Sequence, residues 1–198
     1  MRGIKNIFSA LVIMVFGIVM IVISAGEMSD YAKKGEDLAS LRLEDIKEGM
    51  MIEGDLPYNY GCYEQVQKEN SKEGFGFYYL IDVGDEGFMG LYTAVDDLIE
   101  KLDAQYAALE SSPDGTNIPV VHFKGKVTKM DSEDSRLYQQ ALLGVGLSYD
   151  FVESSCLKLY IKCVDTGSHP VILIIGIAAT VIGLVLLLVF IRRKMIGR

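Results

Sequence analysis

The chain has 198 residues, half of them hydrophobic, and a formal net charge of −8 at pH 7. This length allows one folded domain in addition to short membrane segments. Between its two ends the chain has no cluster of Lys and Arg, and it is acidic overall. These properties argue against nucleic acid and anionic lipid headgroups as partners, because both attract clustered basic residues.

Two apolar stretches lie near the ends of the chain. Ile7–Gly26 and Val171–Ile191 contain no charged residue. At about 1.5 Å of helix rise per residue, each stretch covers the roughly 30 Å hydrocarbon core of a bilayer. The sequence therefore predicts four parts, which are an N-terminal transmembrane helix that acts as a signal anchor (1–26), an extracytoplasmic α+β domain (27–169), a C-terminal transmembrane helix (170–191) and a basic cytoplasmic tail (192–198).

The charges that flank these stretches predict the topology. All 27 acidic residues lie between the stretches, with 13 of the 19 basic ones, so this segment carries a net charge of −14. Short basic flanks remain cytoplasmic, so both termini are expected inside a cell membrane and the middle segment outside. A cleaved signal peptide ending near Ala25 is the alternative. We favour the uncleaved anchor, because the apolar run exceeds the usual ~7–15 residues and Ile23 fits the cleavage pattern poorly.

Small residues recur seven apart in both apolar stretches. They let helix backbones approach closely, so the two stripes are expected to face each other within a hairpin or to drive a homodimer. Neither stretch has an ionisable residue, which argues against a transporter or a proton relay. The stripe residues are Ala10, Gly17, Ser24, Gly176 and Gly183.

The middle segment alternates strand and helix patterns. Residues that favour strands are interrupted by Gly and Pro, and apolar residues at helical spacing follow in Asp96–Leu109, with Leu98, Ile99, Leu102 and Tyr106 on the buried face. A short second helix is predicted at Arg136–Leu143. The predicted strands are Met50–Asp55, Cys62–Gln67, Gly76–Val83, Phe88–Thr93, Val120–Met130 and Leu157–Val164.

This order of elements predicts a mostly antiparallel, five-stranded barrel with one covering helix and a small helical insert. Ile46–Gly54 is similar to the opening strand of the oligonucleotide/oligosaccharide-binding (OB) barrels in ribosomal-protein S1-like domains. The aromatic and basic RNA-binding surface of those domains has no counterpart in this chain, so their function does not carry over. An open α+β sandwich is the alternative fold.

The layout of the whole chain, together with Gly54–Gly61, resembles small two-pass bacterial membrane proteins of uncharacterised function. Those proteins have an extracytoplasmic domain between their spans. The resemblance implies this architecture, and it implies no activity and no catalytic residues.

The sequence presents no catalytic, cofactor or metal motif. Its two histidines are interpreted as solvated polar residues, because His122 alternates with Lys124 and Lys126 on one face of a strand and His169 precedes Pro170 at a helix start near the membrane surface. The acidic runs Asp82–Gly87 and Asp131–Asp134 lack the spacing of a calcium loop. They are interpreted as a hairpin turn and a helix start.

Three cysteines lie outside the apolar stretches. In an oxidising compartment Cys62 is a candidate for a disulfide with Cys156 or with Cys163. The alternative is that all three are reduced thiols that pack as small apolar side chains.

Tyrosines gather between Leu56 and Tyr63, where Pro57 and Gly61 bend the chain. Tyrosine offers rigid contact area with a polar tip, so this loop is the candidate partner contact. The alternative, which we favour, is that the rings fold back onto the core. The candidate contact residues are Tyr58, Tyr60 and Tyr63.

The sequence therefore predicts a non-enzymatic integral membrane protein, whose acidic outer domain binds a protein or an envelope component. Two alternatives remain open, a membrane-anchored hydrolase that uses carboxylates and an accessory subunit of a transporter. No cofactor is expected, and the expected partners are the bilayer and a protein.

Overall fold

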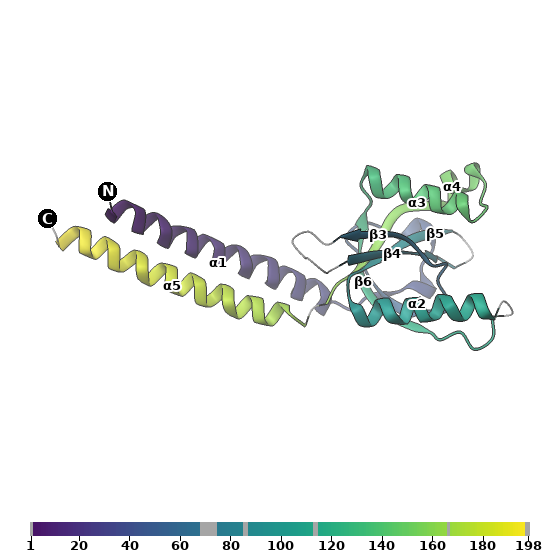
Figure 1. The fold of residues 1–198 in the computed structure, drawn as a ribbon, viewed down its shortest axis with the longest axis horizontal. Helices are drawn as coiled ribbons and strands as arrows, with labels where there is room; N and C mark the ends of the chain where they lie inside the picture. Colours follow the sequence, from purple (N-terminus) through teal and green to yellow (C-terminus); the bar gives the residue numbers. More distant parts are fainter. Residues whose placement is uncertain (1, 68–74, 85–86, 113–114, 166, 197–198) are drawn as a thin grey trace. The chain divides into compact units, whose positions relative to one another are not determined.

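The computed structural model describes residues 2–67, 75–84, 87–112, 115–165 and 167–196 (Figure 1). The chain divides into two compact units. One consists of Met1–Ala32 with Thr166–Arg198, and the other is Lys33–Asp165. We call them the helical unit and the domain.

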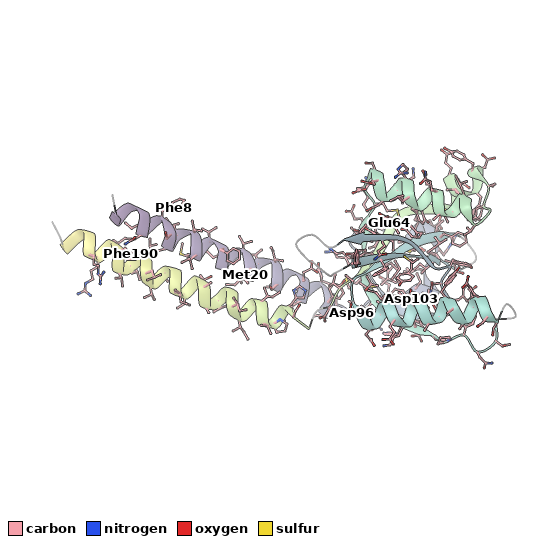
Figure 2. All side chains as sticks on the ribbon, in the orientation of Figure 1. Phe8, Met20, Glu64, Asp96, Asp103 and Phe190 are labelled. Atoms are coloured by element: carbon pink, nitrogen blue, oxygen red, sulfur yellow. The ribbon has the colours of Figure 1, made fainter. Side chains whose placement is uncertain are left out.

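The helical unit contains α1 (Arg2–Ala32) and α5 (His169–Ile196). Both helices are long and apolar enough to cross a membrane. α1 continues past Gly26, where the apolar stretch ends. Large apolar side chains project outward from both helices, among them Phe8 of α1 and Ile174 of α5; Phe8 is labelled in Figure 2.

The small-residue stripes meet between α1 and α5. A Cβ atom added at Gly17 would lie 2.7 Å from the carbonyl oxygen of Gly176, and one added at Gly183 would lie 2.7 Å from the backbone nitrogen of Met14. Ala10 and Ser24, the other members of the α1 stripe, are buried. The hairpin alternative therefore describes this structure. A homodimer through the same residues would require the hairpin to open.

The domain is built on one seven-stranded sheet with the order β1-β2-β6-β7-β5-β4-β3. Helix α2 (Asp96–Ser111) covers one face, and α3 (Ser132–Gly144) with α4 (Tyr149–Ser155) covers the other (Figure 1). The strands are β1 (Glu36–Asp37), β2 (Met51–Leu56), β3 (Cys62–Gln67), β4 (Phe75–Asp82), β5 (Phe88–Thr93), β6 (Val121–Lys129) and β7 (Cys156–Cys163).

The prediction of an OB-like, five-stranded antiparallel barrel was wrong. Strand β7 lies between β6 and β5 and pairs with β5 in parallel, so the sheet is mixed. It is also open, with β1 and β3 at its two edges. The parallel pair follows from the long connection from β5 through α2, β6, α3 and α4, since parallel strands require a crossover of a dozen or more residues.

The positions of the predicted strands were largely confirmed. All six lie within one or two residues of a strand in the structure, and the predicted helix at Asp96–Leu109 is α2. Its inner residue Leu102 is fully buried, as its spacing predicted. The helix predicted at Arg136–Leu143 is longer and begins at Ser132. The sequence analysis missed β1 and α4.

The sheet must curve, because a short segment joins two distant strands. β2 ends at Leu56 and β3 begins at Cys62, yet five strand spacings separate them in the sheet. In a flat sheet, five spacings would place β2 and β3 about 24 Å apart. The connecting residues reach at most about 21 Å when fully extended. The sheet is therefore coiled toward the shape of a barrel without closing.

Each face of the sheet has its own core. The larger core lies under α2 and includes Ile52, Tyr79 and Leu102. The smaller one lies under α3 and α4 and includes Tyr138 and Leu142. The hydroxyl of Tyr79 also donates a hydrogen bond of 2.7 Å to Asp103 of α2, so polar and apolar contacts both attach this helix (Figure 2).

A buried amide network also fastens α2. The side chain of Gln105 donates to the carbonyl oxygens of Leu56 and Pro119, both at 2.8 Å, and accepts from Asn59 at 2.8 Å. Asn59 also donates to the carbonyl of Leu102 at 2.9 Å and accepts from the backbone N–H of Gly61. Both amide side chains are fully buried. They connect the end of β2, the start of β6 and the β2–β3 connection to one helix.

Replacing Gln105 by Ala should lower the free energy of unfolding by about 2–4 kcal/mol, because it leaves buried backbone carbonyls and the Asn59 amide without partners. Urea unfolding of the full chain in nanodiscs, followed by tyrosine fluorescence, measures the change. Gln140→Ala is the matched control, since Gln140 is exposed on α3 and accepts a hydrogen bond from Arg136 of the same helix. It should change stability by less than about 0.5 kcal/mol. Equal effects would contradict the assigned role of Gln105.

Gly17→Leu should separate α1 from α5, because the new side chain collides with the backbone of Gly176 and Thr180. The axes should move toward the roughly 8–10 Å spacing of helices that pack through larger side chains. Pulsed electron resonance between spin labels on the two helices measures the distance. Gly26→Leu is the control, because nothing lies within 4 Å of a Cβ added there. An unchanged distance in Gly17→Leu would show that the stripe does not set the packing.

Candidate functional site: an acidic cavity beside strand β2

A cavity of about 430 Å³ opens within the domain where β1, β2 and β6 lie side by side. Most of the side chains around it are charged. Its lining residues are Lys34, Gly35, Asp37, Ala39, Glu53, Gly54, Asp55 and His122. We call it the acidic cavity, because three carboxylates and one lysine are among these residues.

The register between β2 and β6 places the polar residues together. Asp55 lies opposite His122, and Glu53 lies opposite Lys124. Successive side chains of a strand point to opposite faces. The neighbouring residues Ile52, Leu56, Val121 and Phe123 are buried in the core under α2. Because the apolar face of β2 and β6 is buried under α2, the charged residues lie on the opposite face of these strands.

The imidazole of His122 lies between two carboxylates. Its Nδ1 is 2.9 Å from Oδ1 of Asp55, which is a hydrogen bond, and its Nε2 is 3.8 Å from Oε1 of Glu53. The side chain of His122 is 63% exposed. It thus lies on the solvated face of its strand, as predicted. The sequence analysis missed its partner Asp55, which is 67 residues earlier in the chain.

Glu53 is held in its ionised form. The ammonium of Lys124 lies 2.9 Å from Oε2 of Glu53, and the backbone N–H of Gly35 donates to the same oxygen at 3.4 Å. The hydrogen bond from Lys124 is the main reason why the pKa of Glu53 is lowered. This carboxylate is ionised at neutral pH and forms an ion pair with Lys124.

The predicted contact tyrosines contact one another and the smaller core. The ring of Tyr58 meets that of Tyr60 edge-on at 5.7 Å, and Tyr60 meets Phe88 at 5.4 Å. The ring of Tyr63 lies 5.9 Å from those of Tyr78 and Tyr138. The favoured interpretation of rings folded back onto the core therefore matches these contacts. A partner contact through this loop remains a prediction.

A second acidic group lies on the α3 side of the sheet and does not line the cavity (Figure 2). The β3–β4 register shifts between Cys62 and Glu64, and this bulge places both Tyr63 and Glu64 toward α3. Burial, followed by repulsion from Asp134, raises the pKa of Glu64. Burial also raises the pKa of Asp134, whose Oδ2 accepts a hydrogen bond of 3.4 Å from Tyr78.

The run Asp131–Asp134 begins α3, as the sequence predicted. The side chain of Asp131 caps the helix by accepting hydrogen bonds from the backbone N–H groups of Glu133 and Asp134. Across the part of the chain that the structure describes, no three His, Cys, Asp or Glu side chains are placed to hold a metal ion. His169 begins α5, and its Nδ1 is buried with no hydrogen-bond partner among the described residues.

The three cysteines are free thiols, and the fold keeps them apart. Cys62 begins β3, whereas Cys156 and Cys163 are the two ends of β7. Three strand spacings separate β3 from β7, which is about 14 Å along the sheet. A disulfide needs Cα atoms within about 7 Å. The structure therefore does not bring Cys62 together with either candidate partner. Burial raises the pKa of Cys163 to about 12, so it is an unreactive core thiol.

Replacing Glu64 by Gln and Asp134 by Asn should stabilise the domain at pH 7 and flatten the pH dependence of its stability. Because the folded state raises both pKa values, protonation favours folding. The cost of these two charges is full above the folded pKa values and is relieved as the pH falls through them. Thermal unfolding between pH 7 and pH 5, compared with the native chain, measures this. Glu100→Gln, a control on the exposed side of α2, should keep the native profile, and an unchanged slope in the double variant would contradict the assignment.

Comparison with known proteins places the chain in a family. Residues 3–193 match the family described as a domain of unknown function, DUF8577. No curated protein and no solved structure matches the chain. The family match includes both apolar helices and the whole domain between them, in agreement with the expected uncharacterised family. The chain therefore belongs to the DUF8577 family.

Proposed function

We propose that this protein is a membrane-anchored, non-enzymatic binding protein whose domain captures a positively charged partner in the acidic cavity. The observation that carries the proposal is the cavity itself. It has the volume of a small-molecule site, and its lining contains Asp37, Glu53 and Asp55 against the single lysine Lys34.

The charge of the surrounding segment supports a cationic partner. The residues between the two apolar stretches carry a net charge of −14. A field of this sign raises the local concentration of cations and speeds their association. Glu53 is ionised at neutral pH but is paired with Lys124, so the net negative charge of the lining comes from Asp37 and Asp55 against Lys34.

In this proposal α1 and α5 span a cell membrane, both termini are cytoplasmic and the domain lies outside. The support comes from the basic residues that flank the apolar stretches, with no acidic residue among them. The packing of α1 against α5 through glycines gives the anchor a compact hairpin. These helices hold the domain at the membrane, and no transport step is assigned to them.

A carboxylate-dependent hydrolase is the second candidate, and the pair of Asp55 and His122 favours it. An aspartate that hydrogen-bonds one imidazole nitrogen orients the other as a base. The cavity lacks the remaining parts of such a site. Among the residues that the structure describes, no Ser, Thr or Cys lines it, and Glu53 has a lowered pKa, the opposite of what a general acid needs. The carboxyls with raised pKa values, Glu64 and Asp134, are not in its lining.

Binding of charged peptides to the full chain in nanodiscs tests the proposal. A lysine-rich decapeptide should bind, and a glutamate-rich one should not. The double variant Asp37→Asn, Asp55→Asn should weaken binding of the basic peptide about tenfold, since each lost charge contact is worth roughly 0.5–1 kcal/mol at an exposed site. The native affinity should also fall with added salt.

The matched control is Asp96→Asn with Glu100→Gln on α2, which changes the net charge by the same amount outside the cavity (Figure 2). It should leave the affinity nearly unchanged. If both double variants lose the same affinity, the attraction belongs to the overall charge, and the cavity is not the binding site.

A further inference from the structure

Exposed apolar side chains of the domain gather in one short segment. Six large apolar side chains are exposed among the described residues of the domain, and four of them lie in residues 143–151, which run from the end of α3 into α4. We call these residues the exposed segment. Apolar residues scattered singly over a surface need no explanation, whereas a concentration of them marks an interaction site. The four residues are Leu143, Val145, Tyr149 and Phe151.

A row of four aromatic rings leads from this segment to the β2–β3 connection. The ring of Phe151 lies 6.4 Å from that of Phe88 at the start of β5, Phe88 lies 5.4 Å from Tyr60, and Tyr60 lies 5.7 Å from Tyr58. We call these four residues the aromatic row. All four side chains are at least partly exposed. The row shares Phe151 with the exposed segment, so the two form one surface. It contains two of the tyrosines that the sequence predicts as a partner contact.

The smaller core holds this surface in place from beneath. Leu142 and Val152 are buried in that core, on either side of the exposed residues in the chain. The side chain of Ser148 caps α4 by accepting a hydrogen bond of 3.3 Å from the backbone N–H of Phe151. The aromatic side chains at 149 and 151 are therefore presented on a fixed support. Rigid aromatic side chains on such a support lose little conformational entropy when a partner binds.

The charges of this surface are negative. No Lys or Arg occurs within residues 137–157, whereas Asp150 and Glu153 are both exposed on α4. Asp82 lies opposite Phe88 in the register of β4 and β5. The faces of aromatic rings also attract the cations of Lys and Arg. The carboxylates and the rings thus favour a partner of the same, positive charge.

We propose that the exposed segment and the aromatic row form a docking surface for a partner protein segment in which apolar side chains are flanked by Lys or Arg. The apolar side chains of the partner cover Phe151 and its neighbours, and its cations meet the ring faces and carboxylates. A second copy of this chain fits less well, because a symmetric contact brings identical patches together and their like charges repel. The surface is separate from the proposed function, since none of its residues lines the acidic cavity.

Tryptophan fluorescence of the full chain in nanodiscs tests the docking surface. The chain has no tryptophan, so Phe151→Trp places a single reporter on the surface. The probe is a capped heptapeptide with leucine, phenylalanine and leucine between two pairs of lysines. At low salt it should shift the tryptophan emission to the blue in a saturable way. Two matched peptides should bind about fivefold more weakly or not at all, one with three serines at its centre and one with glutamates in place of the lysines.

Charge reversal at Asp150 tests the contribution of the carboxylates. In the reporter chain, Asp150→Lys should weaken binding of the lysine peptide about fivefold and should strengthen binding of the glutamate peptide. Glu100→Lys on α2 is the matched control, because it changes the net charge equally on the other face of the sheet. It should leave both affinities nearly unchanged. Thermal unfolding of each variant reports whether the fold is retained.

The remaining outcomes overturn the docking surface. The first is equal binding of the lysine and glutamate peptides, or no emission shift with either. A shift that Asp150→Lys leaves intact and that Asp37→Asn with Asp55→Asn abolishes assigns the peptide to the acidic cavity, which supports the proposed function instead. Quenching of the tryptophan by brominated lipids without peptide identifies the bilayer as the occupant. A dimer of the native chain that Phe151→Ser dissociates identifies a second copy.

Discussion

The hydrogen bonds of Gln105 attach α2 to the two strands, β2 and β6, that line the acidic cavity. Gln105 donates from α2 to Leu56, the last residue of β2, and to Pro119, shortly before β6 begins. These two strands supply Asp55 and His122, the facing residues of the cavity. A slip of one residue between them would turn every side chain of a strand to the other face. The amide network therefore keeps the charged residues on one face and the apolar ones on the other.

Stability does not explain the charges on that face. The side chains of Asp55 and His122 are mostly exposed, and exposed ion pairs contribute roughly 0–1 kcal/mol. The opposite face of the same strands buries Ile52, Leu56 and Phe123, each of which stabilises the fold by about 1.5–3 kcal/mol. The apolar face is thus enough to hold the strands together. The polar face is not needed to hold the strands together, which fits a role in binding.

The sequence of this chain predicts the positions of its strands and helices better than it predicts which strands pair with each other. Alternation and helical spacing located six strands and α2, because those signals depend on which side chains are buried. The parallel pair of β5 and β7 depends on contacts between residues about 70 positions apart, and no local pattern encodes it. The small-residue stripes were visible because both partners repeat at the helical period. The cavity was not visible in the sequence, since only the register between β2 and β6 places Asp55 opposite His122.

The carboxylates of the two acidic groups have pKa values shifted in opposite directions, because their surroundings differ. Around the cavity, a hydrogen bond from Lys124 lowers the pKa of Glu53, and the side chain of Asp55 is 71% exposed. Under α3, burial raises the pKa values of Glu64 and Asp134, so their negative charge weakens the packing that surrounds it. A cationic ligand gains most from a carboxylate that is already ionised and accessible. Of the two groups, only the cavity meets both conditions, and this is why we place the binding site there.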